Sequence, residues 1–154
     1  MKAKYILIVL CVLCVRMGFA QDKLFEKYSE MDNVTSIYIS KAMFRMIPNI
    51  KDLDMNLATL KDKIEALQLI NCSEAELISR MRKDFSQLVQ SGRLELMRIR
   101  DGKKRITFYS DQKGNRIREL LMLADTDSSF TVIQLTGDFT LKDIQDLTDK
   151  ATAN

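Results

Sequence analysis

The 154-residue sequence contains no histidine and no tryptophan, and only one proline, three cysteines and five glycines. Histidine is the commonest general base and a common zinc ligand. Its absence excludes Ser-His-Asp, Cys-His and HExxH chemistry. The few prolines and glycines rule out collagen-like repeats and flexible linkers. With 46% hydrophobic and 29% charged residues, the composition is that of one globular domain.

The N-terminus has the pattern of a secretory signal peptide. Two lysines precede an apolar run over residues 5–15, and Gly18-Phe19-Ala20 follows it. A basic segment, a short apolar segment and a small-x-small motif predict export and cleavage between Ala20 and Gln21. A membrane-spanning helix needs about 20 apolar residues, so the run is too short to remain as an anchor.

Cleavage would change the charge of the protein. Lys2, Lys4 and Arg16 account for the whole net charge of +3, so residues 21–154 carry 21 basic and 21 acidic side chains. Binding to a nucleic-acid backbone requires a basic excess. The balanced charge therefore predicts no nucleic-acid partner.

Cleavage would also remove two of the three cysteines. Cys11 and Cys14 both follow a leucine inside the apolar run, and no cysteine stands at the cleavage site, so a lipoprotein is not expected. Cys72 remains alone and can form no internal disulfide. The sequence around it predicts an exposed thiol, and no neighbouring group is expected to activate it.

Hydrophobic periodicity predicts a single α+β domain over residues 21–154, preceded by a signal peptide over residues 1–20. We expect a largely antiparallel sheet of about five to six strands with helices packed on it. Strands are expected at 34–39, 64–71, 94–100, 103–110, 117–124 and 130–136, and helices at 22–31, 41–47 and 74–90 and after Thr140, with a further short helix around 57–63.

Local signals define several of these elements. Residues 64–71 fit a helix or a strand, and we choose a strand because Ser73-Glu74-Ala75-Glu76 reads as a capping box that begins the next helix. Asp101-Gly102 between two alternating segments predicts a hairpin. The segments 120–123 and 130–135 are apolar on both faces, which predicts central strands.

The predicted basic hairpin is the candidate interaction surface. Alternation places one set of its side chains on a common face, and arginine binds carboxylates and phosphates in a bidentate manner. The alternative is a solvated outer face whose charges protect an edge strand from pairing. The candidate surface comprises Arg98, Arg100, Arg105 and Tyr109, and the opposite face, expected to point to the core, comprises Met97, Ile99, Ile106 and Phe108.

Catalytic patterns are weak. The close carboxylate pairs, such as Asp125/Asp127, are better explained by turns and helix starts than by a catalytic cleft. Ser110-Asp111-Gln112-Lys113 matches a Ser-x-x-Lys nucleophile motif but falls in a predicted turn. We therefore predict no catalytic site, no metal site and no cofactor.

Three stretches together resemble a known family. They are VTSIYISKAMFRMIPNI (34–50), LELMRIRDGKKRITFYSD (94–111) and FTVIQLTGDFTLKDIQDL (130–147). With the signal peptide, they resemble DUF4252, a family of small exported Bacteroidetes proteins of unknown function. The resemblance implies residence in the periplasm or cell envelope, or secretion, and it supplies no catalytic residues.

Three hypotheses for the function follow. The first is a non-enzymatic envelope protein that binds or regulates a partner protein, with no membrane span after cleavage. The second is a periplasmic binder of a small anionic or acyl ligand held between sheet and helices. The third is a hydrolase that uses carboxylates or the Ser110/Lys113 pair without histidine. The sequence predicts neither the partner nor the oligomeric state.

Overall fold

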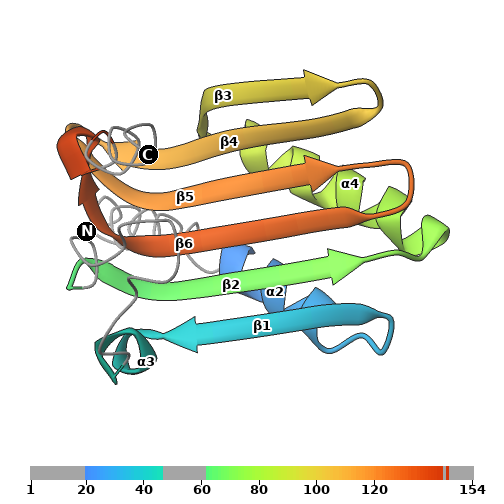
Figure 1. The fold of residues 1–154 in the computed structure, drawn as a ribbon, viewed down its shortest axis with the longest axis horizontal. Helices are drawn as coiled ribbons and strands as arrows, with labels where there is room; N and C mark the ends of the chain where they lie inside the picture. Colours follow the sequence, from blue (N-terminus) through green and yellow to red (C-terminus); the bar gives the residue numbers. More distant parts are fainter. Residues whose placement is uncertain (1–19, 47–61, 144, 146–154) are drawn as a thin grey trace, which may run out of the picture.

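The protein folds into one six-stranded sheet with helices on both sides. The computed structural model describes residues 20–46, 62–143 and 145. The strands lie in the order β1-β2-β6-β5-β4-β3, and all neighbours are antiparallel (Figure 1). The elements in chain order are α2 (Ala20–Ser29), β1 (Val34–Ser40), α3 (Lys41–Met46), β2 (Ile64–Cys72), α4 (Ala75–Gln90), β3 (Leu94–Asp101), β4 (Lys104–Lys113), β5 (Arg116–Asp125) and β6 (Phe130–Thr140).

This architecture confirms the predicted α+β class and the antiparallel sheet. The ambiguous segment at 64–71 is strand β2, and the two segments that are apolar on both faces form the central strands β5 and β6. Three predicted segments lie wholly or mostly outside the described residues. They are residues 1–19 of the signal peptide, most of the short helix around 57–63 and most of the C-terminal helix, while Ala20 begins α2.

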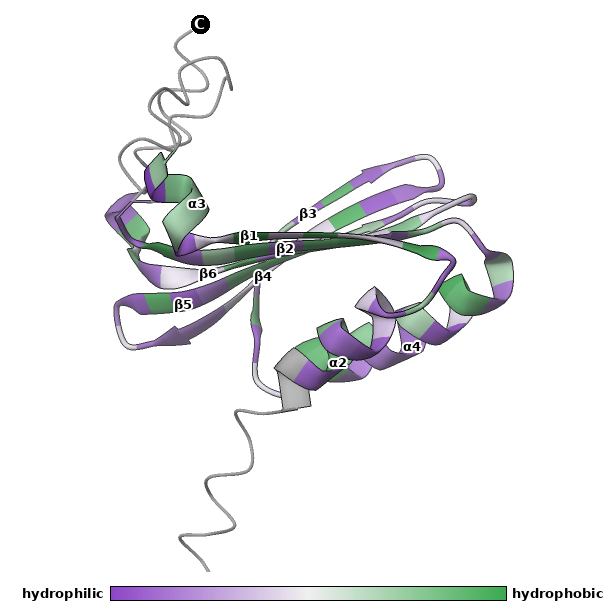
Figure 2. Cartoon of the chain, turned by 90° about the horizontal axis from the view of Figure 1, so that it is seen from below, coloured by the Kyte–Doolittle hydropathy of each residue, from purple (hydrophilic) through white to green (hydrophobic). Residues whose placement is uncertain are grey.

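Helices α2 and α4 cover one face of the sheet, which we call the helix face (Figure 2). The apolar stripe of α4 and the inward side chains of α2 form the main core with β1, β2, β5 and β6. Phe85 of α4 lies at its centre and is fully buried. The buried members of this core are Phe25, Tyr28, Val34, Ile70, Cys72, Leu77, Ile78, Met81, Phe85, Val89, Leu121, Phe130 and Val132.

Helix α3 lies on the opposite face, which we call the open face (Figure 2). The Ser40 hydroxyl accepts a hydrogen bond from the Met43 backbone N–H (3.4 Å), as an N-cap of α3 does. Phe44 is buried in a small cluster at one end of the sheet, together with Ile64, Ile117 and Phe139. Register shifts at Ile64/Ala66 and Ile117/Glu119 lie at this end.

Two expectations about the connection from the end of β2 to the start of α4 are wrong. The N-cap residue is Glu74, and it makes no side-chain capping bond, so Ser73 and Glu76 form no capping box. The Glu74 carboxylate instead accepts a hydrogen bond from the Asn33 side-chain amide (2.6 Å). Cys72 is 1% exposed rather than solvent-accessible, because it ends β2 on the helix face beneath α4.

Candidate interaction surface

The three arginines of the candidate surface lie on one face of the β3–β4 hairpin. Arg100 pairs across the strands with Arg105, and Arg98 pairs with Thr107. Directly paired residues of antiparallel strands share a face, as do residues two positions apart. All three arginines are exposed. The hairpin therefore presents the basic face that the alternation predicted.

The arginines differ in their neighbours. Arg98 forms an exposed ion pair with Glu95, three residues earlier. Within the described part of the chain, no carboxylate lies within ion-pair distance of Arg100 or Arg105. Two adjacent guanidinium groups without a carboxylate partner leave a site open to an acidic partner.

Tyr109 differs from the arginines because it lies further along β4, over the helices. It is half-buried and packs against the main core. Its neighbour on the same face, Thr107, is 4% exposed. The accessible part of the candidate surface therefore consists of the three arginines.

The prediction that the apolar face of the hairpin points to the core is wrong. Met97 and Ile99 are 49% and 45% exposed, because they lie on the open face, which α2 and α4 do not cover. Ile106 and Phe108 of the next strand are half-buried. All eight residues of the edge strand β3 are exposed. The strand therefore offers a backbone edge with arginines on one side and apolar side chains on the other.

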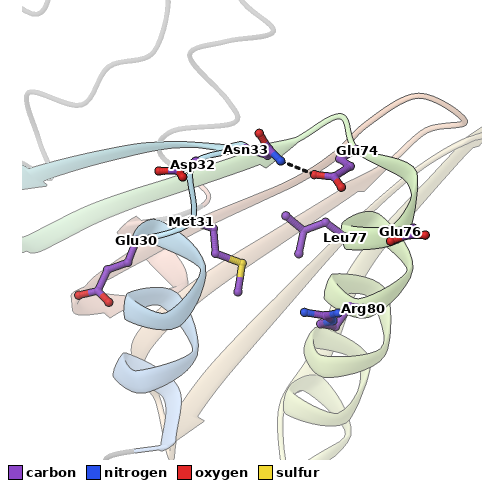
Figure 3. A pocket seen from close by; sticks show the side chains of 8 residues that line it. All are labelled: Glu30, Met31, Asp32, Asn33, Glu74, Glu76, Leu77 and Arg80. Carbon is purple, nitrogen blue, oxygen red and sulfur yellow. Dashed lines mark hydrogen bonds between the residues drawn. The ribbon is translucent and has the colours of Figure 1, made fainter.

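A shallow pocket of about 400 Å³ lies between the end of α2 and the start of α4 (Figure 3). The side chains come from the α2–β1 turn and from the first two turns of α4. The pocket is lined by Glu30, Met31, Asp32, Asn33, Glu74, Glu76, Leu77 and Arg80.

The charges of this pocket oppose an anionic ligand. Four carboxylates line it, and Arg80 is the single cation among its lining residues. The four carboxylates would repel the negative charge of an anionic ligand. The pocket walls also offer few apolar side chains to contact an acyl chain. Across the described ranges, no group of three or more acidic or cysteine side chains is arranged to hold a metal ion.

A buried polar cluster that the sequence pattern did not predict joins the end of α4 to the centre of the sheet. The Arg93 guanidinium binds the Glu119 carboxylate (Nε–Oε1 2.9 Å), and the exposed fractions of the two side chains are 7% and 4%. Gln134 donates to the same carboxylate (3.3 Å). Arg93 also donates to the Leu88 carbonyl near the end of α4 (2.7 Å). The available signal was a glutamate at an inward position of a central strand, which requires a buried partner.

The structure separates the residues of the Ser-x-x-Lys motif. The motif lies in strand β4 rather than in a turn. Ser110 is fully buried, and its hydroxyl has no hydrogen-bond partner among the described residues, whereas Lys113 is exposed. A lysine that activates a serine must lie within hydrogen-bond distance of its hydroxyl. The arrangement therefore supports no Ser-Lys nucleophile.

The carboxylates of the predicted pairs have partners of their own. Arg82 of α4 binds Asp125 in a bidentate manner (Nη2–Oδ1 2.6 Å, Nε–Oδ2 3.0 Å), and Lys103 binds Asp127 (2.8 Å). Asp52 and Asp54 lie outside the described residues. Asp125 and Asp127 thus hold elements together, whereas the neighbouring Glu74 and Glu76 line the shallow pocket between α2 and α4.

A hydrogen-bonded cluster of Lys27, Tyr28 and Asp84 also joins α2 to α4. Asp84 accepts hydrogen bonds from the Lys27 ammonium (2.8 Å) and the Tyr28 hydroxyl (2.7 Å). The Lys27 hydrogen bond is the main cause of the lowered pKa of Asp84. Burial and the bond to Asp84 raise the pKa of Tyr28 well above its usual range. The tyrosine therefore remains a neutral hydrogen-bond donor at physiological pH.

A hydrogen-bonded cap formed by Thr140 and Asp143 at the end of β6 gives a pH-dependent contact. The Asp143 carboxylate accepts hydrogen bonds from the Lys63 ammonium (2.6 Å) and from the backbone N–H and hydroxyl of Thr140 (2.7 and 2.8 Å). Chiefly through the Lys63 bond, these contacts lower the pKa of Asp143 to about 2. A carboxylate whose pKa falls on folding stabilises the native state above its unfolded pKa, near 4.

We therefore expect this contribution to be present at neutral pH and to be lost as the pH falls from about 4 to about 2. The test compares the urea-unfolding midpoints of the parent protein and of Asp143→Asn at several pH values from about 2 to 7. The variant should be less stable at pH 7, and the two midpoints should converge near pH 2. A difference that does not change with pH would contradict the assignment.

One family model matches the chain. The model described as Domain of unknown function (DUF4252) matches residues 28–147, which include all six strands and α4. The chain belongs to the DUF4252 family. No curated protein and no solved structure matches it. Among the described helices of this DUF4252 protein, none combines the length and apolar character needed to span a membrane.

Proposed function

We propose that this DUF4252 protein is an exported, non-enzymatic interaction module of the bacterial cell envelope that binds a protein partner through the β3–β4 hairpin. The observation that carries the proposal is the edge strand β3, in which every residue is exposed. An edge strand with unpaired backbone groups can add a strand from a partner. Such strands are normally shielded, so an exposed one with large apolar side chains points to a binding role.

The side chains of the hairpin favour an acidic partner. Arg100 and Arg105 lie side by side, and Arg98 is two positions away on the same face. Complementary charge accelerates association and selects among partners.

The N-terminal pattern supports export. The basic start, the apolar run at 5–15 and the Gly18-Phe19-Ala20 motif are typical of signal peptides of exported bacterial proteins. We expect N-terminal sequencing of the protein from the periplasmic fraction of its bacterial host to begin at Gln21. Recovery of the uncleaved chain from the cytoplasm would contradict export and would leave the hairpin proposal intact.

Partner capture tests the role of the hairpin. An epitope-tagged protein is used to capture partners from native envelope extract with mild crosslinking, followed by mass spectrometry. We expect the triple variant Arg98→Gln/Arg100→Gln/Arg105→Gln to lose at least about tenfold of the captured partner, because a few central charges dominate such contacts. The unfolding midpoint should change little, since exposed charges contribute little to stability.

The matched control removes three positive charges elsewhere. The variant Arg45→Gln/Lys83→Gln/Lys142→Gln changes exposed cations of α3, α4 and the segment after β6. We expect it to capture the partner as the parent protein does. Equal capture by both triple variants and the parent would show that the basic face takes no part in binding.

A further inference from the structure

We propose that the open face of the sheet is a homodimer interface, in which two copies of the chain pack sheet against sheet. This surface is separate from the arginine face of the hairpin, so the two proposals can fail independently.

The strand register aligns the open-face side chains in three rows that cross all six strands. The central row is apolar at every strand: Ile37, Leu69, Ile133, Met122, Phe108 and Met97. The row nearer α3 runs from Ile39 to Leu94, and the third row runs from Thr35 to Ile99. None of the 18 positions in the three rows carries a charge, in a chain with 29% charged residues.

The described residues cover only one end of this face. Helix α3 lies over that end (Figure 2). The cluster around its Phe44 packs against residues of the row nearer α3, such as Leu67 and Leu135. Away from it, Ile37 is 46% exposed and Met97 is 49% exposed at the two ends of the central row. Soluble monomers rarely expose a continuous apolar patch larger than a few hundred Å².

The size and charge of the face fit a second copy. Six strands about 4.8 Å apart and the two rows that α3 leaves uncovered, about 7 Å apart, give roughly 400 Å² per copy. Two copies would bury about 800 Å², which is the size of weak and transient interfaces, so we expect a dimer with a dissociation constant of about 10 μM or more. A neutral face meets no like charge when it packs on itself, and sheets packed in this way lie about 10 Å apart.

The central row gives the first test. Sedimentation velocity of the purified protein from about 1 to about 100 μM should show a monomer–dimer equilibrium. Met122→Lys places two like charges at the middle of the contact and should raise the dissociation constant at least about 100-fold. The matched control is Gln87→Lys, at an exposed position of α4, and it should leave the equilibrium unchanged.

A crosslink gives a second test that does not depend on a destabilising charge. Met122 lies near the centre of the face, so a two-fold axis through that centre brings the two copies of residue 122 together. Sheets packed about 10 Å apart leave the two Cα atoms too far apart for a disulfide, which needs less than about 7 Å, so a bifunctional maleimide about 10 Å long is the crosslinker. Met122→Cys should form a covalent dimer with this reagent, while Gln87→Cys should not. The native Cys72 is buried and should not interfere.

The outcomes separate the occupants of the face. A monomer at every concentration, with no faster crosslinking of Met122→Cys than of Gln87→Cys, would overturn the proposal and favour coverage by residues 47–61 or 144–154 of the same chain. A dimer that Met122→Lys leaves intact would also overturn it, because the interface would then lie elsewhere.

Discussion

Replacement of Glu119 by alanine is expected to lower the free energy of unfolding by about 3–5 kcal/mol. The carboxylate is 4% exposed and is the only ion-pair partner of the Arg93 guanidinium among the described residues. Its loss leaves a positive charge buried on the helix face without compensation, and Gln134 loses its acceptor as well. Because Arg93 also binds the Leu88 carbonyl, the end of α4 should loosen first.

Urea denaturation followed by circular dichroism measures this effect. The control is Glu95→Ala, which removes the exposed ion pair with Arg98 and should cost less than about 1 kcal/mol. The double variant Arg93→Met/Glu119→Leu should recover part of the loss, since apolar residues of similar size can replace a buried ion pair. A loss below about 1 kcal/mol in Glu119→Ala would mean that water reaches the pair.

The elements of the fold could be predicted because their signals are local. The 3.6-residue stripe of α4 and the Asp101-Gly102 turn each depend on neighbouring residues. The central position of β5 and β6 was also predictable, since strands buried on both faces are apolar on both faces. The DUF4252 resemblance was carried by three such structural stretches, and the family model confirms it.

The face of the sheet that the helices cover could not be predicted from alternation. The pattern correctly separated Arg98 and Arg100 from Met97 and Ile99, but it assigned the apolar set to the core. Alternation distinguishes two faces and does not say which one a helix covers. In this sheet both faces are apolar, so the usual rule that the apolar side is the buried side fails at the edge strand.

The buried ion pair and the missing capping box show a second limit. Arg93 and Glu119 are 26 residues apart, and only the strand order brings them together. At the start of α4, Ser73 and Glu76 have the residue types of a capping box, but Glu74 is the N-cap. A shift of one residue at a helix start is within the ordinary uncertainty of local signals. For contacts that depend on tertiary arrangement, a single sequence can indicate that a buried partner is needed, as Glu119 does, but not which residue it is.

Replacement of Phe85 by alanine is expected to lower the free energy of unfolding by about 3–5 kcal/mol, because it leaves a cavity in the main core. The ring is fully buried. It lies 5.5 Å from the ring of Phe25, 5.9 Å from that of Tyr28 and 6.2 Å from that of Phe130, measured between centroids. Phe85 thus joins α2, α4 and the sheet, and no other described side chain makes these three ring contacts.

Two controls separate the cavity from a general loss of hydrophobic side chains. Phe85→Leu keeps most of the volume and should cost clearly less than the alanine variant. Met46→Ala removes a side chain that is 69% exposed and should change stability by less than about 0.5 kcal/mol.

Hydrogen exchange would locate the damage. Helix α2 contributes Phe25 and Tyr28, which lose their ring contacts with residue 85, so the amides of Ala20–Ser29 should exchange faster than those of β5 and β6 in Phe85→Ala. The bonds of Asp84 to Lys27 and Tyr28 remain in this variant, and they contribute less because they are partly solvent-exposed. Unchanged protection of α2 would mean that this polar contact, rather than the aromatic cluster, holds the helix on the sheet.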